Sequence, residues 1–396
     1  MVRKNNKKVV VAMSGGIDSS VAAALLKRAG FNVVGVFMKF WSPPGKKGLA
    51  GAWNRCCSPE AEKRAGWVAK SLGIPFYVFN VEKEFKKRIV DYFLAGYKKG
   101  ITPNPCVVCN REIKFGLLLE KALALGADYL ATGHYAKIRK FVSRALRSRA
   151  RRGSLNFVHL TSFASLGQMR RSLSDHSQQI RYSLISAKDK TKDQSYFLWQ
   201  LNQKQLKHIL FPVGDLTKTQ VKNLAKKFML PVFDIPESME ICFIQTTIND
   251  FLKKYLRPKP GPIVDTSGAL ISRHRGLWFY TIGQRKGLGL ASGPYYVLDK
   301  NLKKNFLVVT RNEKDLFKKE LLVKNVNWIA GKKPKLPLKV RAKIRYRHQP
   351  ATATLTYNLK LKTYNLKFEK PQRAITPGQS AVFYKGKELI GGGIIS

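Results

Sequence analysis

The stretch Ser14-Gly15-Gly16-Ile17-Asp18-Ser19-Ser20 decides how the first part of this chain folds. It follows a short apolar run, residues 8–13, which predicts a buried strand, and it leads into an Ala- and Leu-rich helical run, residues 19–27. The two glycines let the backbone turn tightly and bring its N–H groups against a phosphate, and the positive end of the helix favours the same anion. The serine hydroxyls add donors, and Asp18 can hold the Mg²⁺ that accompanies a nucleotide. No Gly-Lys-Ser/Thr follows, so the motif predicts a phosphate-binding loop other than the Walker type.

Strand and helix signals alternate on both sides of this motif. Strands are expected at residues 8–13, 32–40, 76–81 and 129–132. Helices are expected at residues 19–27, 59–72 and 113–125, and further along the chain at 198–210 and 218–228. Alternation of this kind is typical of a parallel sheet covered on both faces, in which ligands bind beyond the carboxyl ends of the strands. We therefore expect an α/β catalytic domain over residues 1–210.

A strongly basic segment, residues 137–181, interrupts the alternation. It contains nine arginines and a single acidic residue, Asp175. Because its apolar periodicity is weak, we expect an inserted, mobile, cationic segment. It is either a tolerated surface insertion or an arm that contacts RNA without sequence specificity.

The last third of the chain has a different character. From about residue 260 short β-branched runs alternate with turn sequences, and strands are expected at residues 340–346, 351–357 and 381–384. Such a pattern indicates an antiparallel β-barrel. We expect a small central domain over residues 211–290 and the barrel over residues 291–396.

Composition narrows the functional class. The 396 residues carry 73 Lys and Arg against 24 Asp and Glu, a formal net charge of +49. No apolar run approaches the ~18–20 residues that span a bilayer, and the N-terminus lacks the apolar core of a signal peptide. The five cysteines are too few for a disulfide scaffold. We therefore expect a cytoplasmic protein that does not act at a membrane. The charge predicts a polyanionic partner, nucleic acid above all, with an anionic membrane surface or a general basic bias as the alternatives.

Three cysteines are candidates for chemistry. Cys106 and Cys109 form a Cys-x-x-Cys pair at the start of a predicted helix, where the helix terminus and nearby cations lower a thiol pKa. Cys242 lies far along the chain, and a thiolate pair formed with it could carry a persulfide and resolve it by disulfide exchange. Three alternatives stay open: a zinc site completed by Cys242 or by Cys56 and Cys57, an iron–sulfur cluster on three cysteines, and inert buried thiols.

Taken together, these motifs resemble the PP-loop ATP pyrophosphatases, and within them the tRNA-specific 2-thiouridylases of bacteria and mitochondria. The matching blocks run nearly end to end, at residues 12–20, 36–39, 102–115, 131–136, 192–198, 240–244, 280–289, 343–347 and 376–379. Only the basic segment falls outside them. Two positions depart from the family's usual pattern: Cys106 stands where Asp is common, and Met239 where Gln is common.

The resemblance implies a role for particular residues. Cys109 would be the catalytic nucleophile, and Cys242, returned to the active site by residues 231–247, would carry the persulfide. The residues implied in ATP binding are Ala12, Met13, Ser14, Gly15, Gly16, Ile17, Asp18, Ser19, Met38 and Gly133. The residues implied in contacts with tRNA and its target base are Asn104, Pro105, Cys106, His134, Lys192, Asp193, Gln194, Arg345, Tyr346 and Gln379.

The resemblance also implies a reaction. ATP would adenylate O2 of the wobble uridine in the tRNAs for Lys, Glu and Gln, and a persulfide sulfur would displace AMP to give 2-thiouridine. The reaction needs Mg²⁺ with ATP and a persulfide donor, such as a cysteine desulfurase or a relay protein; an iron–sulfur cluster on Cys106, Cys109 and Cys242 is the less favoured route. Two other functions remain as alternatives: a PP-loop ligase with a small-molecule acceptor, and a non-catalytic RNA-binding protein.

Overall fold

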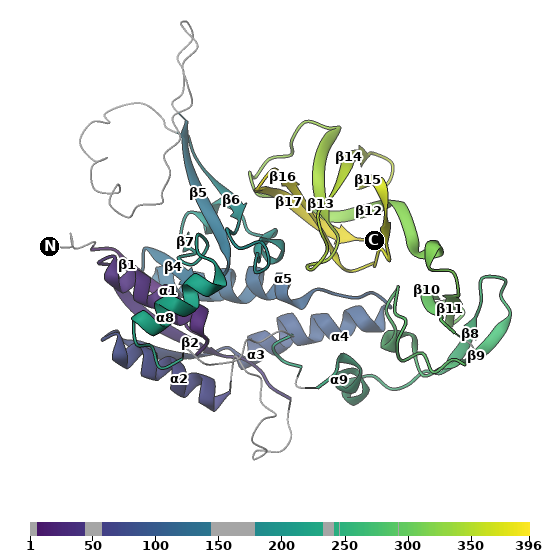
Figure 1. The fold of residues 1–396 in the computed structure, drawn as a ribbon, viewed down its shortest axis with the longest axis horizontal. Coiled ribbons are helices and arrows are strands. Elements are labelled where there is room, and N and C mark those ends of the chain that lie inside the picture. The colour runs from purple at the N-terminus through teal and green to yellow at the C-terminus, as the bar shows by residue number, and fades with distance from the viewer. Residues whose placement is uncertain (1–5, 44–57, 144–178, 233–240, 245, 292) are drawn as a thin grey trace, which may run out of the picture.

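The N-terminal part of the molecule is built on a parallel sheet with the strand order β3-β2-β1-β4-β7 (Figure 1). The computed structural model describes residues 6–43, 58–143, 179–232, 241–244, 246–291 and 293–396. The strands are β1 (Lys8–Ala12), β2 (Asn32–Lys39), β3 (Phe76–Asn80), β4 (Tyr129–Thr132) and β7 (Ile209–Leu210). Every pairing among them is parallel. The predicted strands agree with the first four of these within two residues at each end.

Helices cover both faces of this sheet. Successive side chains of a strand point to opposite faces, so Val9 and Val11 of β1 join one hydrophobic core and Val10 joins the other. The first core packs against α1 (Ile17–Arg28), α2 (Pro59–Ser71) and α8 (Lys218–Lys227). The second packs against α3 (Glu82–Phe85), α4 (Asp91–Lys98), α5 (Pro105–Cys109) and α6 (Leu119–Ala124). Strands buried on both faces are apolar at nearly every position, which is why the sequence predicts them well.

The sheet has a switch point at β1. Its two neighbours, β2 and β4, extend the sheet in opposite directions, and ligands of open α/β sheets bind beside such a point. β1 ends at Ala12, directly before the glycine–serine motif, and β4 ends at Thr132, directly before Gly133. The fold therefore brings two of the predicted nucleotide-binding segments to one edge of the sheet.

The helix predicted over residues 198–210 is wrong. The chain instead forms a 3₁₀ turn (Ser195–Leu198), the four-residue helix α7 (Gln203–Leu206) and strand β7. The side chain of Asn202 accepts from the backbone N–H of Gln205, whose side chain in turn accepts from the N–H of Asn202, and this capping box starts a new helix. The buried side chains of Leu198, Leu201, Leu206 and Ile209 have the spacing of a single helix, because all four pack on the same core.

The helix that carries Cys106 and Cys109 begins earlier than the sequence predicted. It starts at Pro105, since a proline in the first turn has no N–H to leave unpaired. It continues through a π-helical segment, Asn110–Leu118, into α6. Wide π-helical turns are frequent at functional sites, and this one follows Cys109 directly.

The predicted basic insertion is structured at its edges. Its two ends belong to a β-hairpin made of β5 (Ala136–Ser143) and β6 (Gln179–Ser186), while residues 144–178 lie outside the described part of the chain. Antiparallel pairing of β5 with β6 forms this hairpin, and the weak apolar periodicity of the segment did not predict it. β6 also pairs with β17 of the C-terminal barrel, so the hairpin joins the two domains (Figure 1).

The rest of the chain forms two β-domains. The central one contains α9 (Ile248–Tyr255) and a sheet ordered β10-β11-β8-β9, made of β8 (Gly261–Val264), β9 (Leu270–His274), β10 (Tyr296–Asn301) and β11 (Phe306–Thr310). β10 and β11, which the sequence placed with the barrel, therefore belong to the sheet of β8 and β9, which they join through the pairing of β11 with β8. The barrel strands are β12 (Phe317–Trp328), β13 (Leu338–Lys343), β14 (Ala351–Asn358), β15 (Thr363–Arg373), β16 (Ser380–Lys385) and β17 (Glu388–Ile395).

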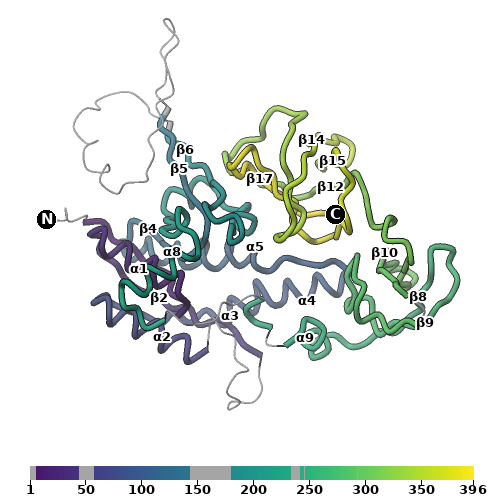
Figure 2. The backbone as a smooth tube through the Cα atoms, viewed as in Figure 1, coloured from purple at the N-terminus to yellow at the C-terminus, as the bar shows by residue number. Residues whose placement is uncertain are grey.

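Pairing of β12 with β17 closes the barrel, and the predicted fold class is confirmed. α4 runs from the N-terminal domain toward the β-domains, and the chain that follows it turns back to α5 (Figure 2). This arrangement places the start of the cysteine-bearing helix where all three parts of the molecule meet.

Candidate active site

One large cavity, of about 2170 Å³, lies beyond the carboxyl ends of the parallel strands. All three parts of the chain contribute to its walls, including the glycine–serine loop, the cysteine-bearing helix, Trp278 of the central domain and Tyr346 of the barrel. Ordinary small-molecule sites measure about 300–1,000 Å³. The cavity can therefore hold a nucleotide and part of a much larger ligand together.

The glycine–serine loop, residues 14–20, has the geometry expected from its glycines. Gly15 has a φ of +70°, and a Cβ there would collide with the backbone of Ala61 in α2. Gly133, at the end of β4, lies so close to the backbone N of Ser19 that a side chain would displace the start of α1. The Ser19 hydroxyl accepts from the N–H of Ser14 at 3.2 Å and donates to the carbonyl of Gly16 at 3.1 Å. Hydrogen bonds within the loop, and close packing against α2 and the end of β4, therefore hold its shape.

Asp18 has two partners in the structure. Its Oδ1 accepts from the Lys218 ammonium at 2.7 Å and from the Tyr135 hydroxyl at 2.8 Å. Lys218 is a residue that the sequence analysis missed, although one signal was available. It occupies the first turn of α8, where a cation opposes the helix dipole unless a nearby anion compensates it.

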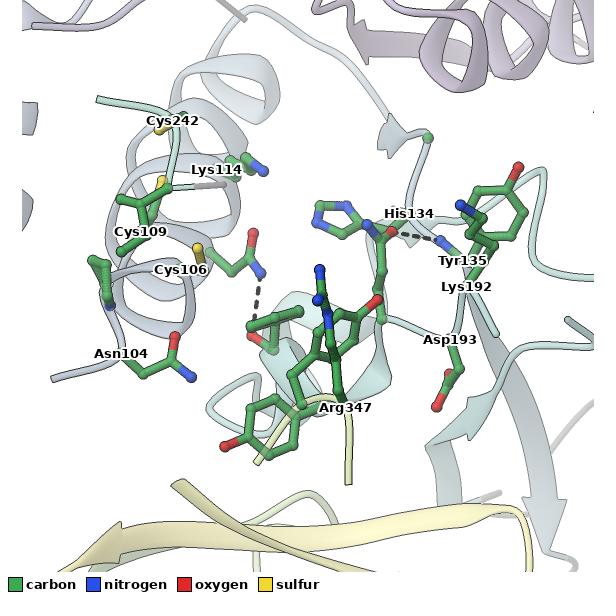
Figure 3. Close-up of a pocket in the computed structure, with 18 of the residues that line it drawn as sticks. Asn104, Cys106, Cys109, Lys114, His134, Tyr135, Lys192, Asp193, Cys242 and Arg347 are labelled. Carbon is green, nitrogen blue, oxygen red and sulfur yellow. Dashed lines mark hydrogen bonds between the residues drawn. The ribbon is translucent and has the colours of Figure 1, made fainter. Parts of the chain in front are cut away.

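The thiols occupy one side of the cavity. Figure 3 shows Cys106 and Cys109 on one helix and Cys242 on a separate segment beside it, opposite His134, Lys192 and Asp193. Cys109 is buried, and Cys106 and Cys242 are partly exposed. The fold has thus brought together three cysteines that are up to 136 positions apart in the sequence.

An aromatic cluster holds the Cys242 segment in place. Phe243 is 1% exposed, and its ring centroid lies 5.8 Å from that of Phe85, 5.3 Å from that of Phe93 and 5.4 Å from that of Phe251. Phe85 and Phe93 belong to the N-terminal domain, and Phe251 belongs to α9. A buried phenylalanine in such a cluster contributes several kcal/mol, on the order of 3–5, to stability. Cys242 is therefore tethered through its immediate neighbour.

Nearly all the residues predicted to bind tRNA line this cavity. They are Asn104, Pro105, Cys106, His134, Lys192, Asp193, Gln194, Tyr346 and Gln379. Arg345 is the one member of that set that does not line it. Its guanidinium instead donates to the carbonyl of Ala374 and to the hydroxyl of Thr376, both at 2.7 Å.

All the residues predicted to bind ATP line the same cavity. They are Ala12, Met13, Ser14, Gly15, Gly16, Ile17, Asp18, Ser19, Met38 and Gly133. The cavity thus joins the predicted nucleotide site, the predicted thiol site and most of the predicted tRNA site in one space.

His134 is held in its neutral form. Burial, and secondly the charge of Lys114, keep the pKa of its ring well below the usual value of 6.5. The ring lies between Phe115 and Phe211, with centroid distances of 5.7 and 5.8 Å, and its Nδ1 is 2.7 Å from the Thr132 hydroxyl. A neutral imidazole can offer one donor and one acceptor to a ligand without adding charge.

The cavity wall is strongly basic. Eleven lysines and arginines line it, against three aspartates. Each aspartate has partners of its own: Asp18 pairs with Lys218, Asp215 with Lys137 at 2.8 Å, and Asp193 accepts the hydroxyl of Ser195 at 2.8 Å. From the sequence, only the overall charge pointed to this basic wall. The cations that were not predicted as site residues include Arg64, Lys114, Lys137, Lys188, Lys190, Lys218, Arg341 and Lys387.

Within the described ranges, no group of three or more His, Cys, Asp and Glu side chains is placed to hold a metal ion. Cys56 and Cys57, candidates for a zinc site, lie outside those ranges. A nucleotide-bound Mg²⁺ needs fewer protein ligands, because it commonly takes one or two carboxylates together with phosphate oxygens. Asp18 has a carboxylate at the glycine–serine loop that could serve as one of them.

The fold and the cavity define a nucleotide-binding α/β protein that carries two β-domains. Comparison with known families agrees with this division. A family model described as tRNA methyl transferase HUP domain matches residues 7–246, one described as tRNA methyl transferase PRC-barrel domain matches 249–311, and one described as aminomethyltransferase beta-barrel domain matches 318–395.

Curated relatives match the chain over almost its whole length. The tRNA-specific 2-thiouridylase MnmA of Clostridioides difficile (strain 630) is 42% identical over 394 residues, and that of Moorella thermoacetica is 43% identical over 395. The tRNA-specific 2-thiouridylase MnmA 2 of Thermoanaerobacter sp. (strain X514) is 44% identical over 396 residues. Each alignment covers 98% of both proteins. The chain therefore belongs to the tRNA-specific 2-thiouridylase family, as the sequence motifs predicted. No helix in the described part of the chain is long and apolar enough to cross a membrane.

Proposed function

We propose that this chain transfers sulfur to C2 of the wobble uridine in the tRNAs for Lys, Glu and Gln, consuming ATP and yielding 2-thiouridine, AMP and pyrophosphate. One observation carries the proposal: a phosphate-binding loop and three cysteines share a single basic cavity. A small-molecule ligase needs the loop but neither the thiols nor the excess of cations. A non-catalytic RNA-binding protein needs the cations but neither the loop nor the thiols.

The first step turns the carbonyl oxygen of the base into a leaving group. O2 of the uridine attacks the α-phosphorus of ATP, the bond from that phosphorus to the bridging oxygen breaks, and pyrophosphate departs. The ring gives up its N3 proton as the C2–O–AMP bond forms. The N–H groups of the loop would hold the phosphates, and Arg64 and Lys218, which line the same cavity, would offset their charge. When bound, Mg²⁺ supplies further neutralisation of the phosphates, with Asp18 as its protein ligand.

The second step delivers sulfur from Cys242. A persulfide-carrying donor protein loads this cysteine, and the terminal sulfur attacks C2 while the C2–O bond breaks and AMP leaves. The Cys109 thiolate then attacks Sγ of Cys242, and the electron pair of the broken S–S bond stays on the transferred sulfur as C2=S forms. N3 regains a proton, and the protons of the persulfide and of Cys109 are released. The two cysteines finish as a disulfide, which a thiol reductant returns to the starting state.

The target base must leave the stack of the anticodon loop to reach the cavity. A wobble base is part of the anticodon loop, and single-stranded bases are recognised when they are splayed out and stacked on aromatic side chains. Phe197 and Tyr346 both line the cavity with their ring centroids 4.5 Å apart, and Tyr346 reaches it from the barrel. The basic wall would hold the neighbouring phosphates.

The decisive experiment is nucleoside mass spectrometry of unmodified tRNA incubated with the protein, ATP, Mg²⁺ and a persulfide donor. We expect 2-thiouridine at the wobble position and AMP in equal amounts. AMP formation with a metabolite and no tRNA would favour the ligase. RNA binding without AMP, unchanged by Cys109→Ala, would favour the non-catalytic protein.

Cys106 distinguishes the persulfide route from a cluster route. If two thiols carry the sulfur, Cys106→Asp keeps much of the activity, because Asp is common at this position in the family. If an iron–sulfur cluster uses all three cysteines, the same variant loses iron and activity together. Iron analysis of protein purified without oxygen, beside the activity of Cys106→Asp, separates the two routes. A full complement of iron with an inactive variant contradicts the persulfide route.

A further inference from the structure

Lys114 is a cation of the large cavity that lies on the cysteine-bearing helix itself. It belongs to the π-helical segment that follows Cys109, its side chain is partly exposed, and it lines the cavity. Lys218, by comparison, is paired with Asp18 at 2.7 Å. Lys114 forms no hydrogen bond or ion pair with any residue in the described part of the chain. Its ammonium is therefore available to an anionic ligand.

The π-helical backbone turns Lys114 toward the cysteines. In such a segment each N–H bonds to the carbonyl five residues back, so residues five apart lie about one turn from each other. Cys109 and Lys114 have this spacing, and both line the cavity. In a regular helix of about 3.6 residues per turn, side chains five apart would point roughly 140° away from each other. Arg111 of the same helix pairs instead with Glu112 at 2.8 Å and lines a separate, smaller cavity of about 380 Å³.

The predicted nucleotide site lies on the other side of Lys114. Figure 3 shows Lys114 on the face of its helix that looks toward His134. The pKa of the His134 ring is lowered by burial and, secondly, by the charge of Lys114, so the ammonium is close enough to act on this ring. His134 follows Gly133, where a Cβ would lie only 2.6 Å from the backbone N of Ser19 in α1. The ammonium therefore faces the space between the thiols and the residues expected to bind ATP.

The sulfur-transfer step creates negative charge in this space. While the C2–S bond forms and the C2–O bond breaks, the electron pair of the C2–O bond passes to the phosphate oxygen, so the departing AMP gains one negative charge. A fixed cation beside that phosphate stabilises the transition state more than the adenylated base, and this difference raises the rate. The β- and γ-phosphates, by contrast, would lie at the glycine–serine loop and have left as pyrophosphate before this step.

We propose that Lys114 is a further catalytic residue, whose ammonium binds the α-phosphate and stabilises AMP as the leaving group when sulfur attacks C2. This assignment rests on the proposed function. It gives one helix two roles in one step, because Cys109 frees the sulfur that C2 receives and Lys114 serves the group that departs. Arg64 and Lys218 remain partners of the phosphates at the glycine–serine loop.

The test compares three variants of the full-length protein. Lys114→Met removes the charge at similar length, and Lys114→Arg keeps it. Arg111→Met is the matched control, because Arg111 is exposed on the same helix and lines only the smaller cavity. Without tRNA, calorimetry measures the dissociation constants of AMP and of inorganic pyrophosphate, and alkylation by iodoacetamide measures the reactivity of Cys109. With tRNA, the dissociation constant of tRNA and the single-turnover rate of thiolation are measured.

We expect Lys114→Met to weaken AMP binding by about 10- to 100-fold, the usual effect of losing a hydrogen bond to a charged group. Pyrophosphate and tRNA should bind within about twofold of wild type, and thiolation should slow by about 100-fold or more, as when an oxyanion donor is removed. Lys114→Arg should recover most of the AMP affinity. Arg111→Met should behave as wild type in every measurement.

Unchanged AMP affinity in Lys114→Met would overturn the assignment. If alkylation of Cys109 then slowed, the ammonium would serve the thiols, and if the affinity for tRNA fell instead, Lys114 would be a contact to tRNA. AMP binding needs neither tRNA nor a sulfur donor, so it separates two failures. A wild-type protein that binds AMP but does not thiolate tRNA contradicts the proposed function, whereas equal AMP binding by wild type and Lys114→Met contradicts the role of Lys114.

Discussion

The glycine–serine loop comes from seven consecutive residues, whereas the thiols of the same cavity come from two segments that are far apart in the sequence. The loop is held within the N-terminal domain, by the bonds of Ser19 to Ser14 and Gly16 and by the bond of Arg64 to the Gly15 carbonyl. The cysteine-bearing helix depends on the barrel at Thr102, and Cys242 depends on the aromatic cluster around Phe243. A local site and an assembled site should therefore respond differently to mutation, and each of the following predictions tests that difference.

The largest expected effect separates the two half-reactions. Cys242→Ser should abolish thiolation and leave adenylation intact, because the phosphate loop does not use the thiol. Asp18→Ala should abolish AMP formation and leave tRNA binding nearly unchanged. Pyrophosphate release reports adenylation, and AMP and 2-thiouridine report the sulfur transfer, so all three are measured on the same samples; tRNA binding is measured separately by filter retention. Equal AMP yield from Asp18→Ala and wild type would remove the loop from the proposed mechanism.

The second prediction tests the assembled side through Phe243. Phe243→Ala should reduce thiolation far more than adenylation, because it loosens the segment that carries Cys242. It should also lower the free energy of unfolding by about 3–5 kcal/mol, as expected for a buried phenylalanine. Phe243→Leu is the matched control, since it fills most of the space and should keep most of both properties. Chemical denaturation gives the free energy of unfolding, and single-turnover assays give the rates of adenylation and thiolation. Equal loss of both half-reactions in a folded Phe243→Ala protein contradicts the division into two sites.

The comparison also explains how much could be predicted from the sequence. The parallel sheet and the phosphate loop were predictable, because buried strands such as β1 and the Gly15 turn have local signatures. The residues chosen on family resemblance, Cys109 and Cys242 among them, line the cavity with the exception of Arg345. The pairing of Lys218 with Asp18 and the hydrogen bond of Gln379 to Thr102 were not predictable. Each contact joins two segments that are far apart in the sequence and meet only in the folded protein. The false helix at residues 198–210 has the same origin, since burial on one core imitates helical spacing.

The third prediction concerns Lys218, which links the local site to α8. Lys218→Met should weaken ATP binding by roughly 10-fold or more, because the ammonium sits beside the phosphate loop and orients Asp18. Loss of the pair should also cost about 1–3 kcal/mol of stability, between the values for exposed and buried pairs. Lys222→Met, on the exposed side of the same helix, is the control and should change neither quantity. ATP titration by calorimetry checks the first effect. An unchanged ATP affinity would show that the phosphate loop works without this partner.

The smallest effect is a pH dependence that belongs to His134. Its pKa is lowered in the folded protein by burial and by Lys114, so the unfolded chain binds a proton that the folded chain rejects. The free energy of unfolding should therefore fall as the pH drops below about 6.5, where the unfolded ring becomes charged, and should be insensitive to His134 above that value. His134→Phe keeps a ring between Phe115 and Phe211 and should remove this part of the acid sensitivity. His208→Phe is the control, since His208 bonds the Asp128 carbonyl near the surface. Denaturation at pH 5.5 and pH 7.5, on the order of one unit either side of the unperturbed value, measures the difference. If the two variants lose stability equally on acidification, then His134 is not the buried neutral group that the cavity requires.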